Sequence, residues 1–320
     1  PWAMATAERF ARGGVQLLAM AGCRRIGFGS ECGDAARLQA VAEILLSPAV
    51  QEDIRGELAA GITYAAARQR AVQTCLGDAA AVLRQPNDTL AVEYLKACRW
   101  LGVGMTPMAV RRVGAAHDGG AAEGYAAASH IRQLLRQGGE ALSYLPEAAA
   151  TVLARELAAG RIADGKNVER AVLARLRRMT EKEFAAYDGG GEGLYHRVYD
   201  AVRGSATTEA LLAAAKTKRY TAARLRRMVL AAWLGMAEMP ETVPYARVLA
   251  ANGTGRAILR QMRKAGVPVL TKAADVAALG DAAETLFRRE AEYTDLYTLG
   301  YADLGQSAPG SDWRMTPVMR

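Results

Sequence analysis

Several residues in the first half of the chain are of types that can hold a phosphate-bearing ligand. Gly29 ends a short apolar run and opens a glycine-rich turn, where a glycine lets the backbone come close to a nucleotide. Asn87 offers a donor and an acceptor for a base edge or a ribose, and the guanidinium of Arg112 can fork onto phosphate oxygens. Each has a plainer explanation. Gly29 could belong to an ordinary βα turn, Asn87 could stabilise a turn or cap a helix, and Arg112 could be a solvated charge at a strand end.

A second group of candidates lies at the start of a predicted helix. Ser129 can cap free N–H groups while the helix dipole faces an anion, and Arg132, one turn later, can reach the same anion. The alternatives are capping without a ligand for Ser129 and a surface ion pair for Arg132. Arg111 precedes Arg112 and would point to the opposite face of a regular strand, so at most one of these two arginines should line a site.

Residues 216–227 hold six cations in a dozen residues, with one tyrosine among them. Arg224 and Arg227 share a helical face because three positions separate them. This pattern suits an RNA backbone with one stacking ring, whereas a solvated helix face is the plainer explanation. The candidates are Lys216, Lys218, Arg219, Tyr220, Arg224 and Arg227. A second cluster of arginines, Arg170, Arg175, Arg177 and Arg178, could extend the same surface.

The basic residues are concentrated in the second half of the chain. Residues 1–150 carry 15 Lys and Arg against 14 Asp and Glu, and residues 151–320 carry 26 against 19. A polyanionic partner for the second half would gain affinity from counterion release. The alternative is that the basic surface only aids solubility.

Composition excludes several classes of protein. With 51% hydrophobic and 23% charged residues the chain can bury a sizeable core. No apolar run approaches the roughly 20 residues that cross a bilayer, and no secretory signal opens the chain, so we expect a cytoplasmic protein without a membrane partner. The four cysteines form no CxxC pair and only three histidines accompany them, so we expect reduced thiols and no metal site in the protein.

The pattern of elements predicts an α/β domain followed by a mainly helical one, with the boundary near residues 140–165. A strand over 24–29, a turn and a helix form the repeating unit of a doubly wound sheet. In the first half we also expect helices over 3–20, 34–46, 50–76 and 89–100, a strand over 106–113 and a helix that starts near residue 129. Helices continue to about residue 239. A small α/β piece follows, with strands over 245–250 and 267–271 and helices over 253–265 and to about 289, and we expect a loose tail from residue 308.

Eight segments together resemble one enzyme family, and they occur in that family's order. They are FARGGVQLLAMAGCRRIGFGSECGD, QPNDTLAVEYLKA, VRRVGAAHD, AASHIRQLL, GEGLYHRVYDAV, KTKRYTAARLRRMVL, YARVLAANGTGRAIL and YTDLYTLGY. The chain is thereby identified as similar to the tRNA(Met) cytidine acetate ligase family. In AASHIR, Ala127 stands where the family has a first serine, so one hydroxyl contact is missing.

The resemblance implies a fold and an activity. Residues 1–150 would be an N-terminally truncated, Rossmann-like nucleotidylyltransferase (HUP-type) domain that binds ATP. Residues 151–320 would be a mainly α-helical, basic, tRNA-binding domain with a small C-terminal α/β element. The family uses ATP, with Mg²⁺, to activate acetate as acetyl-adenylate and acetylates N4 of the wobble cytidine of elongator tRNA(Met). The resemblance implies ATP contacts at Gly29, Asn87, Arg112, Ser129 and Arg132. It also implies tRNA contacts at the six candidates within residues 216–227.

The family's HxGH loop, which contacts the ATP phosphates, has no counterpart here. The three histidines are His117, His130 and His196, and none stands in an HxxH spacing. We therefore name no catalytic residue and expect these 320 residues alone to be inactive. Two alternatives stay open: a nucleotidylyltransferase that acts on a small acceptor, and a non-catalytic RNA-binding fragment.

Overall fold

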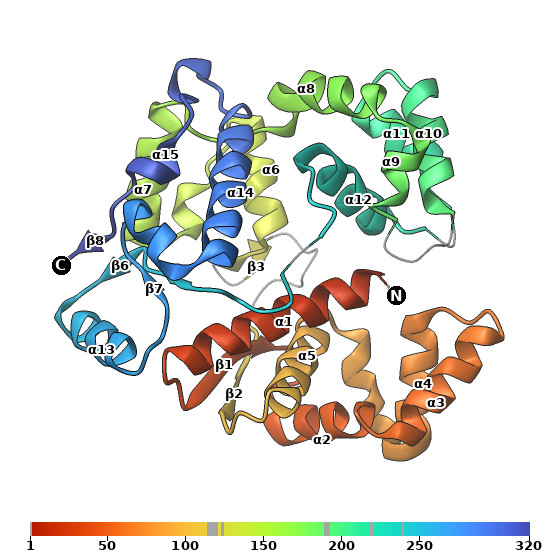
Figure 1. Cartoon of the computed structure of the whole chain (residues 1–320). Helices are drawn as coiled ribbons and strands as arrows, with labels where there is room; N and C mark the ends of the chain where they lie inside the picture. The colour runs from red at the N-terminus through yellow and green to blue at the C-terminus, as the bar shows by residue number, and fades with distance from the viewer. Residues whose placement is uncertain (1, 114–120, 123–124, 189–192, 218–219, 239) are drawn as a thin grey trace. The chain divides into compact units, whose positions relative to one another are not determined.

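The computed structural model describes residues 2–113, 121–122, 125–188, 193–217, 220–238 and 240–320 (Figure 1). Contacts within the chain group it into two compact units, which are described separately. One is Phe10–Ala159, and the other combines Pro1–Arg9 with Gly160–Arg320. His117, Lys218 and Arg219 lie outside the described residues.

The Phe10–Ala159 unit is built around two parallel strands, β1 (Arg25–Ser30) and β2 (Thr106–Arg111). Along β1, buried and exposed residues alternate, so that Ile26 and Phe28 face the core. Among the described residues no strand pairs with the other edge of β1. The fold prediction of strands and helices in alternation therefore holds here, with a two-stranded sheet in the described residues.

The helices of this unit are α1 (Trp2–Met20, from Phe10 on in this unit), α2 (Ala35–Leu45), α3 (Pro48–Ala59), α4 (Tyr64–Leu76), α5 (Pro86–Trp100), α6 (Ala128–Gln137) and α7 (Glu147–Ala158). Of these, α5 packs against β1 and α2 packs against β2. Two 3₁₀ helices, Gly77–Arg84 and Leu142–Tyr144, and the short hairpin of β3 (Ala121–Ala122) and β4 (Tyr125–Ala126) complete the unit.

The prediction of one helix over 50–76 is wrong, because two helices occupy this stretch. Gly61 takes a left-handed φ of 83° after α3 ends. Thr63 then caps α4, with its side chain accepting a hydrogen bond from the Ala66 amide. The core of the unit includes Val15, Ile26, Leu38, Val41 and Leu95.

A buried ion triad joins α4 to α5. Arg68 Nη1 lies 2.9 Å from Glu93 Oε1, and Lys96 Nζ lies 2.8 Å from Glu93 Oε2. All three side chains are buried. The Glu93 carboxylate therefore forms ion pairs with two cations at the interface between α4 and α5.

The Gly160–Arg320 part begins with a helical bundle. Its helices are α8 (Gly165–Arg178), α9 (Glu181–Ala185), α10 (Leu194–Gly204), α11 (Thr208–Ala215) and α12 (Ala222–Leu234). Their apolar faces meet around Leu176, Phe184, Leu194, Leu225 and Met228. In α9, Thr180 and Glu183 form a capping box, which fixes the start of this short helix.

A small α/β piece follows the bundle. Strands β5 (Ala246–Arg247) and β7 (Val269–Leu270) pair in parallel, as do β6 (Ala250–Ala251) and β8 (Val318–Met319). The helices are α13 (Gly253–Lys264), α14 (Asp281–Thr298) and α15 (Ser311–Arg314), with 3₁₀ turns at Ala273–Leu279 and Leu304–Gln306. The strand predicted over 245–250 is therefore two short strands with different partners, and α14 continues beyond residue 289.

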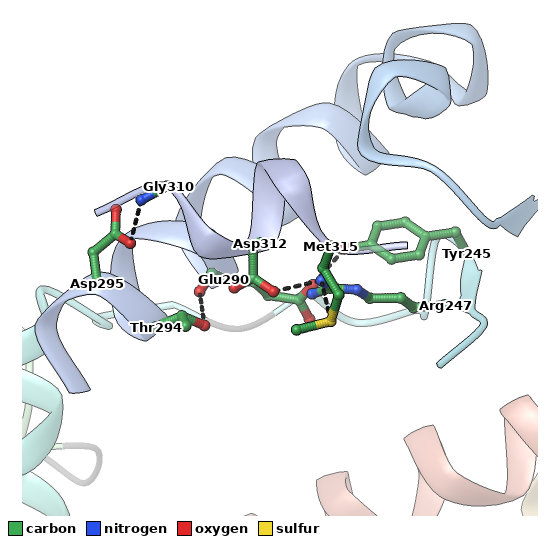
Figure 2. Close-up of polar contacts among 8 residues, drawn as sticks. All are labelled: Tyr245, Arg247, Glu290, Thr294, Asp295, Gly310, Asp312 and Met315. Carbon is green, nitrogen blue, oxygen red and sulfur yellow. Dashed lines mark hydrogen bonds and ion pairs between the residues drawn. The ribbon is translucent and has the colours of Figure 1, made fainter. Parts of the chain in front are cut away.

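The expectation of a loose tail from residue 308 is wrong. Asp312 of α15 is only 4% exposed, and its carboxylate accepts a hydrogen bond from the Arg247 guanidinium (Figure 2). Gly310 N donates to Asp295 Oδ1 at 2.7 Å, and Trp313 packs edge-on against Phe287 with ring centroids 4.8 Å apart. These contacts and the β6–β8 pairing hold the segment against the rest of the piece. Within the described residues, no helix is long and apolar enough to cross a membrane.

Candidate functional site

A cavity of about 530 Å³ opens between α1, β1 and α5 in the Phe10–Ala159 unit, and we call it the α1–α5 cavity. Its volume is in the range of ligand pockets. It is lined by Gly14, Leu17, Leu18, Ile26, Gly27, Phe28, Gly29, Asn87, Leu90, Ala91 and Tyr94. Gly29 and Asn87, which the sequence suggests separately, therefore share one cavity. Both Gly27 and Gly29 are exposed, and a Cβ atom at Gly27 would meet no other atom within 4 Å.

The turn after β1 is held by the buried carboxylate of Asp88, which is 1% exposed. Ser30 Oγ donates to Asp88 Oδ1 at 2.5 Å, and Glu31 N donates to the same oxygen at 2.9 Å. Cys32 N donates to Asp88 Oδ2 at 3.2 Å. In turn, Gly33 N donates to Ser30 Oγ at 2.9 Å. The backbone at the end of β1 is therefore fixed by the first turn of α5.

Glu31 makes the reciprocal connection to the start of α5. Asn87 Nδ2 donates to Glu31 Oε1 at 2.5 Å and Asp88 N donates to Glu31 Oε2 at 2.9 Å. Burial raises the pKa of Glu31, but the hydrogen bonds from the Asn87 side chain and from the Asp88 and Asn87 amides outweigh it, and the pKa is lowered overall. The donor end of the Asn87 amide is thus engaged, while its oxygen makes no hydrogen bond with the described residues.

Two consecutive arginines lie at the end of β2: Arg111 is its last residue and Arg112 follows it. Arg112 N donates to Ser30 O at 2.9 Å, and a Cβ atom at Gly29 would lie 4.0 Å from Arg112 Cγ. The Arg112 side chain therefore lies beside Gly29. A Cβ atom at Gly33 would lie 2.9 Å from Arg111 Cβ, so Arg111 covers the glycine of the turn. Both arginines are exposed.

Ser129 and Arg132 lie on α6 with exposed side chains. The N-cap of α6 is Ala127, which has no side-chain oxygen to give, and Ser129 is the second residue of the helix. Capping by Ser129 is therefore not observed, and the first amides of α6 lack a side-chain cap. The hydrogen bonds and ion pairs between described residues connect neither Ser129 nor Arg132 to Gly29, Asn87 or Arg112.

The residues of the predicted tRNA surface differ in exposure. Lys216 is exposed. Tyr220 and Arg224 are buried, at 7% and 6% exposed, and their side chains are not on a surface that a nucleic acid would contact. Arg224 Nη2 donates to Asp188 O at 3.3 Å and lies 3.4 Å from Asp188 Oδ1, and its guanidinium lies 5.3 Å from the Tyr220 ring centroid. These two residues brace the start of α12.

Arg227, one turn further along α12, is half-buried. Its Nε and Nη2 atoms make no hydrogen bond with the described residues. Burial lowers the pKa of Arg227, and the nearby charge of Arg224 lowers it further. A guanidinium with unused donors beside a like charge is a group that an anion would stabilise.

Glu31 and Asp88, which fix the geometry of the cavity, are absent from the sequence-based candidates. A signal was present for Asp88, since an acidic residue in the first turn of a helix is favoured by the helix dipole. Glu31 and Asp88 are more than fifty positions apart, so no local sequence pattern indicates that they contact each other.

Comparison with known proteins shows which family the chain belongs to. The profile described as HIGH Nucleotidyl Transferase matches residues 1–311. The tRNA(Met) cytidine acetate ligase of Thermoanaerobacter sp. (strain X514) is 30% identical over 315 residues, with 94% of this chain and 78% of that protein covered. The protein of the same name from Syntrophotalea carbinolica is 35% identical over 276 residues, covering 82% and 66%.

Solved structures of Thermotoga maritima TmcAL are also similar. The apo form has a TM-score of 0.90 at 27% identity and covers 98% of this chain and 81% of that one. The form bound with alpha-thio ATP has a TM-score of 0.90 at 26% identity and covers 98% and 80%. The family prediction is thereby confirmed. The chain belongs to the HIGH nucleotidyl transferases and, among them, to the tRNA(Met) cytidine acetate ligase family, whose members are ligases that modify tRNA.

Proposed function

We propose that the chain acts in the ATP-dependent N4-acetylation of the wobble cytidine of elongator tRNA(Met). The observation that carries this proposal is the likeness over 98% of the chain to a structure bound with alpha-thio ATP. Relatives at 30–35% identity that are named tRNA(Met) cytidine acetate ligases support the acceptor and acetate as substrates. Since the proposed substrates are a tRNA, ATP and acetate, we assign the protein to the cytoplasm.

The chemistry needs an activated acyl group, because a cytidine amine does not attack acetate. In the first step a carboxylate oxygen of acetate attacks the α-phosphorus of ATP, and the bond to the bridging oxygen breaks to release pyrophosphate. In the second step the N4 amine attacks the acetyl carbon of acetyl-adenylate, AMP leaves and N4 loses a proton. The protein contributes alignment and charge stabilisation to both steps.

The α1–α5 cavity is the proposed ATP site. Gly29 leaves room for the nucleotide and the free amide oxygen of Asn87 accepts a hydrogen bond from it, while Arg112 binds phosphate oxygens. Ser129 and Arg132 supply a second phosphate contact at the uncapped start of α6. The described residues hold no group of three or more His, Cys, Asp and Glu that could bind a metal, so Mg²⁺ would enter with the ATP phosphates.

In this proposal the two halves of the chain bind different substrates. Residues 1–150 bind ATP and residues 151–320 bind tRNA. Lys216 and Arg227 contact the RNA backbone, as do Lys218 and Arg219. Tyr220 and Arg224, which are buried, position this surface rather than contact RNA.

The nucleotide site is tested by two neighbouring substitutions. Arg112→Gln should weaken ATP binding about tenfold, which corresponds to the loss of one charge-assisted contact. Arg111→Gln is the matched control, because it removes the same charge at the adjacent position. Isothermal titration calorimetry with alpha-thio ATP measures the affinity of both variants. Equal affinity of the two variants for the nucleotide would show that Arg112 makes no specific contact with it.

The reaction is tested by mass spectrometry of nucleosides from elongator tRNA(Met) incubated with ATP and acetate. Since no HxGH sequence occurs in residues 1–320, we expect these residues alone to yield no N4-acetylcytidine. A version joined to a family segment that carries the histidine loop should yield it. Absence of the product from both, with ATP bound and the proteins folded, would instead support a nucleotidylyltransferase for a small acceptor.

A further inference from the structure

A second large cavity lies beside α13, and we call it the α13 hollow. Its volume is about 510 Å³, and it shares no residue with the individual ATP and tRNA contacts proposed above. It is lined by Arg256, Leu259, Arg260, Arg263, Thr271, Lys272, Thr316, Pro317 and Met319. Four of these nine residues are cations and none is acidic.

The four cations are exposed and lack carboxylate partners. No ion pair between described residues includes Arg256, Arg260, Arg263 or Lys272. The hydrogen bond recorded within the hollow is from Arg263 Nη2 to Thr271 Oγ1, at 3.1 Å. Moreover, residues 242–274 contain six Lys and Arg and no Asp or Glu. This stretch of the chain therefore contains no acidic residue that could neutralise these side chains.

The fold places the three arginines in one row. Spacings of four and three residues put Arg256, Arg260 and Arg263 on one face of α13, spread over about 10 Å of helix. Met262 on the opposite side is buried and anchors the helix. Asn252 caps α13 by accepting a hydrogen bond of 2.9 Å from Gly255 N. The helix that presents the arginines is therefore well fixed.

Two other segments form the walls. Strand β7 ends at Leu270 and delivers Thr271 and Lys272 to the hollow. The β6–β8 pair, with Val318 N donating to Leu249 O at 3.0 Å, brings Thr316 to Met319 alongside. Cations from a helix and from the end of a strand thus converge on one concave surface.

We propose that the α13 hollow binds the phosphodiester backbone of RNA, and this proposal rests on the proposed function by adding a second contact region for the tRNA. A row of exposed cations along a helix matches successive phosphates better than it matches one compact anion. The lining contains no aromatic ring on which a base could stack. The hollow therefore supplies affinity without base recognition.

The test uses the full chain and fluorescence anisotropy of labelled elongator tRNA(Met) over a series of KCl concentrations. The variant Arg256→Gln, Arg260→Gln, Arg263→Gln should bind roughly 10- to 100-fold more weakly at low salt, and the slope of log K against log salt should fall by about 2. An unrelated tRNA should lose affinity to the same extent, because the contacts are to backbone.

The matched control removes three arginines whose charges are already paired on the surface: Arg55→Gln, Arg70→Gln and Arg99→Gln, paired with Glu52, Glu57 and Glu43. It changes the net charge equally and should shift affinity less than about twofold. Replacing the three arginines of the hollow by lysine should preserve the salt slope. Circular dichroism checks that all variants are folded.

Two results would overturn the proposal. One is an unchanged salt slope in the glutamine variant, and the other is loss of ATP binding in that variant with tRNA binding intact, which would mark a site for free polyphosphate. The acetylation assay separates this proposal from the proposed function. RNA binding through the hollow with no N4-acetylcytidine from the version carrying the histidine loop would contradict only the proposed function.

Discussion

The side-chain amide of Asn87 donates a hydrogen bond of 2.5 Å to Glu31, although 56 positions separate the two residues. The same carboxylate accepts the Asp88 amide, while Asp88 accepts the Glu31 amide. Residues 31 and 88 therefore bind each other's backbone. This exchange fixes the distance between the end of β1 and the start of α5, and with it one wall of the α1–α5 cavity.

Glu31 should make stability depend on pH at the acidic end. Its folded-state pKa lies below the ordinary value of 4.5, so its contribution is complete above pH 4.5 and is lost as pH falls through the lower, folded-state pKa. Glu31→Gln removes this component. Urea unfolding between pH 3 and pH 6 should therefore show a flatter pH profile for the variant, and parallel profiles would contradict the argument.

Asp88→Ala should destabilise the Phe10–Ala159 unit strongly. It removes a buried acceptor from Ser30 Oγ and from two amides of the turn. The loss in free energy of unfolding should be about 3 kcal/mol. Asp88→Asn keeps one acceptor oxygen and should lose clearly less. Chemical denaturation of both variants measures the difference, and an equal loss would show that the hydrogen bonds contribute little.

For the buried triad of Arg68, Glu93 and Lys96, we expect one substitution to destabilise the protein more than replacement of all three residues. Glu93→Gln leaves Arg68 and Lys96 buried without a carboxylate and should cost about 3–5 kcal/mol of unfolding free energy. Replacing all three residues by Leu or Met of similar volume should cost much less, because no charge remains to be desolvated. Denaturant unfolding compares the two proteins. A triple variant weaker than Glu93→Gln would mean that packing dominates at this position.

Arg227→Met should separate stability from RNA binding. The substitution removes a half-buried cation that burial and Arg224 both disfavour, so the melting temperature should rise. If Arg227 contacts a phosphate, tRNA binding should weaken and its salt slope should fall by about 1. Thermal unfolding and anisotropy are measured on the same preparation. A lower melting temperature would show that Arg227 is structural.

Gly29, near the end of β1, and Gly33, in the turn after it, should respond differently to substitution by alanine. Gly33 has a φ of 68°, and a Cβ atom there would lie 2.9 Å from Arg111 Cβ, so Gly33→Ala should destabilise by more than about 1 kcal/mol. At Gly29 the nearest atom, Arg112 Cγ, is 4.0 Å away. Gly29→Ala should leave stability nearly unchanged and weaken ATP binding. Denaturation and calorimetry together distinguish the two outcomes.

Local elements could be predicted from the sequence, but the contacts between them could not. The strand expected over 24–29 is observed as Arg25–Ser30, because its apolar alternation and glycine turn are local signals. Arg224 is buried against Asp188, which lies 36 positions away along the chain. Helical spacing predicts that Arg224 and Arg227 share a face, and it carries no information on whether that face is covered. The order of the segment from residue 308 is unpredictable for the same reason, since a composition rich in Gly, Ser and Pro carries no information on the contact between Asp312 and Arg247.

The pairing of β6 with β8 also sets an order of assembly. Arg247 and Asp312 meet across 65 positions, and β8 follows them, so this part of the chain closes a long loop at an entropic cost that local helix formation does not carry. A polypeptide translated only as far as α14 already has the sequence of α13 with its arginines and the wall at Thr271 and Lys272, yet it lacks the wall formed by residues 316–319. Any contact that depends on the complete shape of the hollow therefore has to wait until residue 319 has been synthesised.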